Sequence, residues 1–155
     1  MINWIYFPLC DRPTKMVVDI VSVFETVADE IDSATHKEQE SNVVLSKVRN
    51  GLVELGFLVE SGKKANEKIN VPVLFGQKGK MIRSFDADAY CEQENFIIEV
   101  EAGRGVTNYQ FLKDLFQACM LHEVSYLAIA VRNKYRNSHD YEKVHTSFET
   151  LYASQ

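Results

Sequence analysis

Several features that identify common classes of protein are missing from this sequence of 155 residues. The three cysteines, Cys10, Cys91 and Cys119, lie far apart without a second Cys or His at zinc-ligand spacing, so neither disulfides nor a zinc knuckle is expected. The four histidines show no metal-ligand spacing either. Nothing resembles a nucleophile elbow, a P-loop or a dinucleotide fingerprint. Any function must therefore be read from other residue types.

Long hydrophobic runs are absent as well. No apolar stretch approaches the roughly 18 residues that a membrane span needs. The opening MINWIYFPLC lacks the basic flank and the small-residue cleavage site of a signal peptide. We therefore expect a cytoplasmic protein without membrane contact. The length fits one domain, 1–155, which we divide into an N-terminal strand and helix (1–35), a core (36–131) and a basic loop with a C-terminal helix (132–155).

An excess of positive charge is the third absence. The chain has 17 Lys and Arg against 22 Asp and Glu, and its net charge is −5. This balance argues against a protein that coats nucleic acid by bulk electrostatics. It does not exclude nucleic acid as a substrate, because an acidic metal site contributes to the negative count and bound cations offset part of it.

What the sequence does contain is a cluster of acids between residues 81 and 105. Asp86 and Asp88 alternate along one expected strand, and Glu99 and Glu101 alternate along the next. Successive side chains of a strand point to opposite faces, so each pair shares one face. Four carboxylates on one patch raise one another's pKa unless a proton or a cation intervenes. We therefore expect a divalent metal there.

The pattern of apolar residues predicts an α/β protein. Helices are expected over 14–32, from Thr35 to Leu55 with a capping box formed by Thr35 and Glu38, over 107–121, and from His139 onward. Strands are expected over 56–60, 71–75, 80–90, 96–101 and 124–131.

These elements predict a mixed sheet of four to five strands with helices on both faces. The glycines of 76–79 indicate a hairpin, so three strands form a meander. The order strand, helix, strand across 96–131 indicates a crossover that makes the last strand parallel to one meander strand. Its apolar run VSYLAIAV favours an interior strand that is covered on both faces.

The helix over 107–121 has two distinct sides. Its apolar residues predict one broad buried face, formed by Phe111, Leu112, Leu115, Phe116 and Cys119. A polar stripe follows the i, i+3, i+4, i+7 spacing on the other side and consists of Gln110, Lys113, Asp114 and Gln117.

Carboxylates at this spacing suit a particular chemistry. Mg²⁺ prefers oxygen ligands and keeps several waters, so one or two carboxylates and a backbone carbonyl can hold it beside a substrate phosphate. Such an ion lowers the pKa of a bound water and stabilises charge on a phosphodiester during in-line attack. The pattern therefore indicates hydrolysis, with Mn²⁺ as a substitute metal.

The order helix, hairpin with Asp88, strand with Glu99-x-Glu101, helix, strand resembles the core of the PD-(D/E)XK nuclease superfamily, the restriction endonuclease-like fold. The likeness covers about 36–131. It implies that Asp88 and Glu99 bind the metal, with the carbonyl of Val100 as a third ligand and Asp86 as the alternative to Asp88. Glu101 occupies the position where most members have Lys. A Glu-x-Glu form is known, but it leaves the general base unassigned.

Further residues have functional and ordinary interpretations that the sequence leaves open. Lys113 either supplies the missing positive charge or is a solvated lysine, and Glu40 either contacts the metal from the first core helix or reaches water near a helix start. Candidates for nucleic-acid contacts are Arg104 in a Gly-Arg-Gly turn, Gln110, Gln117, Arg132, Lys134 and Arg136. The alternative for each is a plain surface residue, which for the two glutamines is the more common role of a polar helix stripe.

Together these observations predict a Mg²⁺-dependent endodeoxyribonuclease of restriction or defence type. Duplex DNA is expected as the substrate rather than a single strand. A homodimer is expected, because a chain this small cuts both strands most simply when each protomer addresses one. The alternative is a catalytically inactive DNA- or protein-binding regulatory protein on the same fold. A third possibility is an unrelated α/β scaffold whose acidic strands bind metal or a basic partner.

Overall fold

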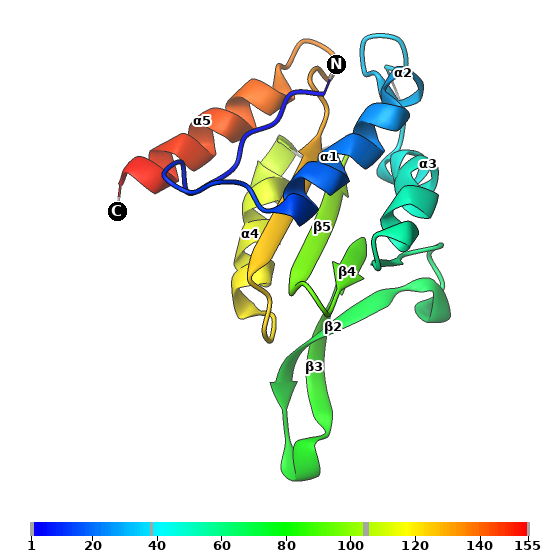
Figure 1. Ribbon diagram of the computed structural model, residues 1–155, viewed down its shortest axis with the longest axis vertical. Helices are drawn as coiled ribbons and strands as arrows, with labels where there is room; N and C mark the ends of the chain where they lie inside the picture. The colour runs from blue at the N-terminus through cyan, green and yellow to red at the C-terminus, as the bar shows by residue number, and fades with distance from the viewer. Residues whose placement is uncertain (1, 38, 104–105, 155) are drawn as a thin grey trace.

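A computed structural model describes residues 2–37, 39–103 and 106–154. Over these residues the chain forms five α-helices, one four-stranded sheet and one two-stranded sheet (Figure 1). The elements in chain order are α1 (Lys15–Thr26), α2 (Ala28–Ile31), α3 (Ser41–Glu54), β1 (Leu58–Val59), β2 (Ile69–Phe75), β3 (Met81–Ala87), β4 (Ala89–Cys91), β5 (Phe96–Glu101), α4 (Gln110–Met120), β6 (Tyr126–Val131) and α5 (Asp140–Ala153). No helix in the described part of the chain is long and apolar enough to cross a membrane.

The four-stranded sheet has the order β1-β4-β5-β6 and is mixed. β5 pairs antiparallel with β4 and parallel with β6, with Phe96 opposite Tyr126 and Glu101 opposite Val131. The predicted α/β class and the parallel crossover strand are therefore confirmed. The predicted interior position of the last strand is wrong, because β6 is an edge strand and all its residues are only partly buried.

Alternation along β5 separates two cores on opposite sides of the sheet. Ile98 and Val100 pack with α1 and α3 in the larger core, around Leu52 and Val48. Ile97, on the other side, packs with Ala118 of α4 and with the base of the β2–β3 hairpin. Figure 1 shows α1 and α3 on one side of the sheet and α4 on the other. The acids that alternate with Ile98 and Val100 therefore lie on the α4 side.

The two N-terminal helical regions are largely as predicted, but their boundaries differ. The first is interrupted at Val27, between α1 and α2, and Thr14 accepts a hydrogen bond from Val17 N at its start. The second begins at Ser41 and not at Thr35, which lies in a turn with its N–H bonded to the carbonyl of Asp32. Because residues 32–36 form a turn closed by the Asp32 carbonyl, the predicted helix start at the capping box is wrong. Glu38, the other residue of that box, lies outside the described residues.

The predicted hairpin is present but does not join the main sheet. β2 and β3 pair only with each other, with Ile69 opposite Ala87 at the base and Phe75 opposite Met81 near the tip. The expected meander is therefore wrong: the chain leaves the hairpin at Asp88 and enters the main sheet as the separate strand β4. Figure 1 shows the hairpin projecting from the body of the protein.

The buried face of α4 is rotated from the predicted one. Phe111 is 1% exposed, and Asp114 and Ala118 are also buried. Phe116 is 66% exposed and Cys119 is exposed, so both were wrongly placed in the core. The i, i+3, i+7 spacing of the buried residues takes a polar residue inward, which a count of apolar positions does not predict.

Candidate functional site

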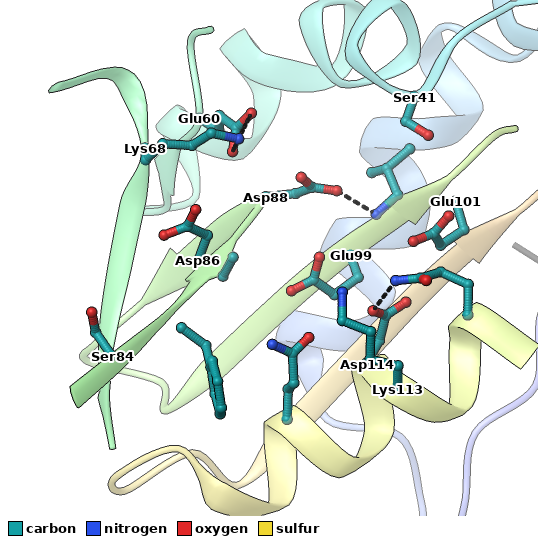
Figure 2. Close-up of a pocket in the computed structure, with 15 residues that line it drawn as sticks. Ser41, Glu60, Lys68, Ser84, Asp86, Asp88, Glu99, Glu101, Lys113 and Asp114 are labelled. Atoms are coloured by element: carbon teal, nitrogen blue, oxygen red, sulfur yellow. Dashed lines mark hydrogen bonds and ion pairs between the residues drawn. The ribbon is translucent and has the colours of Figure 1, made fainter. Parts of the chain in front are cut away.

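A cavity of about 470 Å³ lies on the α4 side of the main sheet, next to the base of the hairpin (Figure 2). Its charged lining comprises six acids and two lysines. The lining residues are Ser41, Glu60, Lys68, Ser84, Phe85, Asp86, Ala87, Asp88, Glu99, Val100, Glu101, Gln110, Lys113, Asp114 and Gln117. The four acids that the alternation predicted to share a patch therefore line one cavity.

Strand pairing explains why Asp88 and Glu99 meet. Ala89 of β4 is opposite Ile98 of β5, so the register extended by one residue sets Asp88 opposite Glu99 on the same face. The backbone N–H of Val100 donates to Asp88 Oδ2 over 2.7 Å. This bond fixes the Asp88 carboxylate at the edge of β5, directly beside the Glu-x-Glu segment.

Burial and mutual repulsion raise the pKa values of these carboxyl groups. Burial raises the pKa of Asp88 to about 6, although the Val100 hydrogen bond opposes the shift. Burial raises the pKa of Glu99 to about 9, and the negative charges of Asp88 and Asp114 add to the shift. Burial, followed by the charge of Asp114, raises the pKa of Glu101 to about 7. The cluster therefore favours any proton or cation that enters it.

Asp114 belongs to this cluster, although it was not predicted as a site residue. It lies on α4, is 5% exposed, and faces Glu101. Gln110 Nε2 donates to its Oδ1 over 3.3 Å, and its carboxyl group lies within hydrogen-bond reach of the Glu101 carboxyl, so the two can share a proton. Burial raises its pKa. The sequence feature that could have identified Asp114 is its place in the polar stripe of α4, one turn from Gln110 and from Gln117, which were both predicted as site residues.

A second missed feature is the ion pair between Glu60 and Lys68. Glu60 follows β1 and is 4% exposed, and Lys68 precedes β2. The ammonium of Lys68 donates to both Glu60 carboxylate oxygens over 2.8 Å, and this bond raises the pKa of the lysine. Each residue stands at the border of an expected strand and loop, where the sequence gives no signal for a pairing across the cavity.

The helix α4 brings three predicted residues to the cavity. Gln110 and Gln117 are partly buried in its wall. Lys113 is exposed, and its positive charge lowers the pKa of Glu101 and of Asp114. The polar stripe therefore faces the acidic cluster, and Figure 2 shows Lys113 and Asp114 extending from α4 toward β5.

Other predicted residues lie elsewhere. Glu40 is the exposed N-cap of α3 and does not line the cavity, whereas its neighbour Ser41 does and accepts from Ala102 N. Lys134 and Arg136 are exposed in the β6–α5 loop, also away from the cavity lining. Arg104 lies outside the described residues.

Arg132 has a structural role that its assignment to nucleic acid did not anticipate. It is 8% exposed, and its guanidinium donates to the backbone carbonyls of Lys37 and Gln39. The guanidinium also lies 4.9 Å from the ring centre of Tyr135. The side chain thus joins the β6–α5 loop to the segment before α3, and its buried position argues against a phosphate contact.

The donor chemistry of the cavity fits a hard divalent cation. All the acids offer oxygen, and burial together with the charges of neighbouring carboxylates raises the pKa of Glu99 to about 9, so a nearby cation would favour its ionised form. The side chains as they stand do not form a coordination shell: over the described ranges no three His, Cys, Asp or Glu side chains converge on one metal position. Binding would therefore need changes of rotamer.

Comparisons with known proteins give no match, so any functional assignment depends on the geometry of this cavity. No protein-family model, curated protein or solved structure matches the chain.

Proposed function

We propose that the protein is a Mg²⁺-dependent endodeoxyribonuclease of restriction or defence type, on a core that resembles the PD-(D/E)XK superfamily. The observation that supports it best is the placement of Asp88 and Glu99. Asp88 lies directly before β4 and opposite Glu99 of β5, beside Glu101 and Asp114, in a cavity that is lined mainly by polar side chains. Structural cores do not gather carboxylates in this way, because repulsion without a cation opposes folding.

In this proposal Asp88 and Glu99 hold the cation, with the carbonyl of Val100 as a third ligand and Asp86 available at the rim. The ion would lower the pKa of a water and stabilise charge on the phosphodiester. The hydrogen bond from Val100 N orients Asp88 for this role. The rim position of Asp86 is consistent with its exposure and with the hydrogen bond that Asn70 donates to it.

Two lysines are candidates for the positive charge that Glu101 does not provide. Lys68 is held by Glu60 on one wall, next to Asp86 and Asp88. Lys113 extends from the opposite wall, is exposed, and is not engaged in an ion pair with any described residue. We assign the substrate-phosphate contact to Lys113, because its ammonium is free to bind an anion while that of Lys68 is committed to Glu60.

The deciding experiment compares supercoiled plasmid incubated with purified protein and Mg²⁺ or Mn²⁺. We expect nicking by the wild type and at least about a hundredfold loss in the double variant Asp88→Asn, Glu99→Gln, because removing groups that act on the transition state costs several kcal/mol. Glu94→Gln is the matched control, since Glu94 is exposed in the turn between the same two strands. Equal nicking by wild type and double variant, or none by the wild type with either metal, would overturn the proposal.

Two observations favour the alternative of a catalytically inactive DNA- or protein-binding regulator. Glu101 stands where most members of the superfamily that the core resembles have Lys, and the described residues contain no ready metal-ligand set. This alternative predicts DNA binding by the wild type without nicking at any metal concentration.

The homodimer stays part of the proposal. Two protomers related by a twofold axis would each address one strand of duplex DNA. Sedimentation of the protein with a duplex tests this, and a strict monomer on DNA would contradict it.

A further inference from the structure

The outer half of the β2–β3 hairpin lies largely in solvent, although the ring of Phe75 packs edge-on against the ring of His122 with the ring centres 5.1 Å apart. Its base is anchored, because Val71 and Ala87 are 0% and 2% exposed against Ile97 and α4. Beyond the base the apolar side chains are exposed: Leu74, Phe75, Met81 and Ile82 have exposed fractions of 55%, 46%, 43% and 63%. Four large apolar side chains exposed together on one hairpin are typical of a surface that binds a partner molecule.

The hairpin is also the basic exception in an acidic chain. Residues 69–85 contain Lys78, Lys80 and Arg83 and no Asp or Glu, whereas the whole chain has a net charge of −5. All three cations are exposed, and none forms an ion pair or a side-chain hydrogen bond with a described residue. The tip therefore presents about three uncompensated positive charges to a partner.

The hairpin continues directly from the acidic cavity. Asp86 and Ser84 of β3 line the cavity, and the strand runs on from them through Arg83 and Ile82 toward the tip. Figure 2 shows Ser84 and Asp86 along the strand that leads away from the acidic cluster. A polymer that enters the cavity is thus in line with the exposed, basic outer half of the hairpin.

We infer that the β2–β3 hairpin is a DNA-binding arm, in which Lys78, Lys80 and Arg83 contact phosphates and Ile82 contacts the sugars or bases. The identity of the polyanion rests on the proposed nuclease function. The physical reason is electrostatic: six acids line the cavity and repel a phosphodiester, so an adjacent basic element has to offset that repulsion. The arm supplies this charge next to the cavity, and its apolar side chains can insert where a purely ionic surface cannot.

The test measures binding of the full-length protein to a fluorescent 30-base-pair duplex by anisotropy, in EDTA so that no cleavage occurs. The variant Lys78→Gln, Lys80→Gln, Arg83→Gln removes three charges from the tip. The control Lys15→Gln, Lys37→Gln, Lys143→Gln removes three exposed charges from α1, the segment before α3 and α5. Thermal denaturation of every variant verifies that the fold is intact.

We expect the tip variant to bind at least about tenfold more weakly at 100 mM salt. We also expect its slope of log K against log salt to be smaller by about 2 to 3, since each phosphate contact contributes about 0.9. The control should match the wild type in both quantities. Ile82→Ser should weaken binding about threefold or more with the salt slope unchanged.

Two results would overturn the inference: equal binding by the tip variant and the control, or no binding by the wild type at 50 mM salt. If the tip or Ile82 variants instead dissociate a dimer and leave DNA binding intact, the arm binds a second copy and the inference also fails. Plasmid nicking separates this inference from the nuclease proposal. Nicking that persists in the tip variant counts against the arm alone, whereas arm-dependent binding without wild-type nicking counts against the nuclease alone.

Discussion

The two faces of strand β5 are made by neighbouring residues and have opposite effects on the fold. Ile98 and Val100 point toward α1 and α3 and are 0% and 3% exposed in the larger apolar core. Glu99 and Glu101 point the other way into the cavity, where burial raises their pKa values to about 9 and about 7. One face therefore stabilises the protein by removing apolar surface from water, while the other brings carboxylates together at a cost.

This difference indicates where function is located. A cluster that opposes folding persists only if the rest of the structure over-determines it, and the hydrogen-bonded strands β4 and β5 do so. Groups with strongly shifted pKa values in an open cavity are typical of sites that bind ions or perform proton chemistry. The apolar face carries no comparable information, because its composition is that of any sheet packed against helices.

The largest effect on stability is expected from the apolar face. Ile98→Ala removes a fully buried side chain and should lower the free energy of unfolding by about 2 to 5 kcal/mol. The melting temperature should fall by about 5 to 15 °C for a chain of this size. Urea or thermal denaturation measures this, with Ile98→Val as the milder version at about 0.5 to 1.5 kcal/mol. A cost below about 1 kcal/mol for the alanine variant would contradict the division between the faces.

A smaller loss of unfolding free energy is expected at the ion pair between Lys68 and Glu60 in the wall of the acidic cavity. Lys68→Met leaves Glu60, which is 4% exposed, without its partner and should cost about 1 to 3 kcal/mol. The double variant Lys68→Met, Glu60→Gln should recover part of this loss, because no unpaired charge remains. Denaturation of the two single variants and the double variant gives the coupling. Additive losses would show that the pair does not stabilise the cavity wall.

These expectations also show which parts of the structure the sequence could predict. The strand over 96–101 was predicted to the residue, because apolar and acidic positions alternate there and β5 is covered on both sides. Placing Asp88 and Glu99 in one cavity followed from the same alternation together with a short turn. Local periodicity is sufficient where the partner strand is also adjacent in sequence.

Other features depend on contacts that periodicity does not encode. The run 124–131 is typical of a covered strand, yet β6 lies at the sheet edge, because the order of strands in a sheet depends on long-range pairing that the run itself does not encode. Phe116 was expected to be buried and is exposed, whereas Asp114 was expected on the polar side and is buried. Helical spacing alone is compatible with either side of α4 facing the sheet. The Glu60–Lys68 pair joins residues across the cavity, and only the folded chain brings them together.

The pH dependence of stability should come from the acidic face. The pKa of Glu99 is raised in the folded state to about 9, and those of Glu101 and Asp88 to about 7 and about 6. Between about pH 4 and pH 9 the native state therefore keeps protons that the unfolded state has lost. The stabilisation that these bound protons give to the native state is complete below about pH 4 and is lost as the pH rises toward 9. In EDTA the melting temperature should fall by several degrees between pH 5 and pH 9, more steeply than that of Glu99→Gln. Parallel curves for the two proteins would contradict the shift.

Divalent cations should reverse part of this loss. If the carboxylates bind Mg²⁺ with a millimolar dissociation constant, 10 mM metal at pH 8 stabilises the native state by about 1.4 kcal/mol. That amounts to a rise of about 3 to 5 °C in melting temperature. Glu99→Gln should show a much smaller rise, and KCl at matched ionic strength separates site binding from screening. An equal rise in both proteins would place the metal elsewhere.

The smallest effect on stability is expected from Lys113, a residue whose substitution should affect activity and not folding. Its side chain is exposed and has no ion pair with a described residue, so Lys113→Ala should change the free energy of unfolding by less than about 0.5 kcal/mol. If Lys113 contacts the substrate phosphate, plasmid nicking should nevertheless fall about tenfold or more. Lys113→Arg should retain more activity than alanine, because it keeps the charge. Lys143→Ala, an exposed lysine on α5, is the control. Unchanged nicking by Lys113→Ala would mean that the lysine is solvated only, and would leave Lys68 as the remaining lysine of the cavity lining to supply that charge.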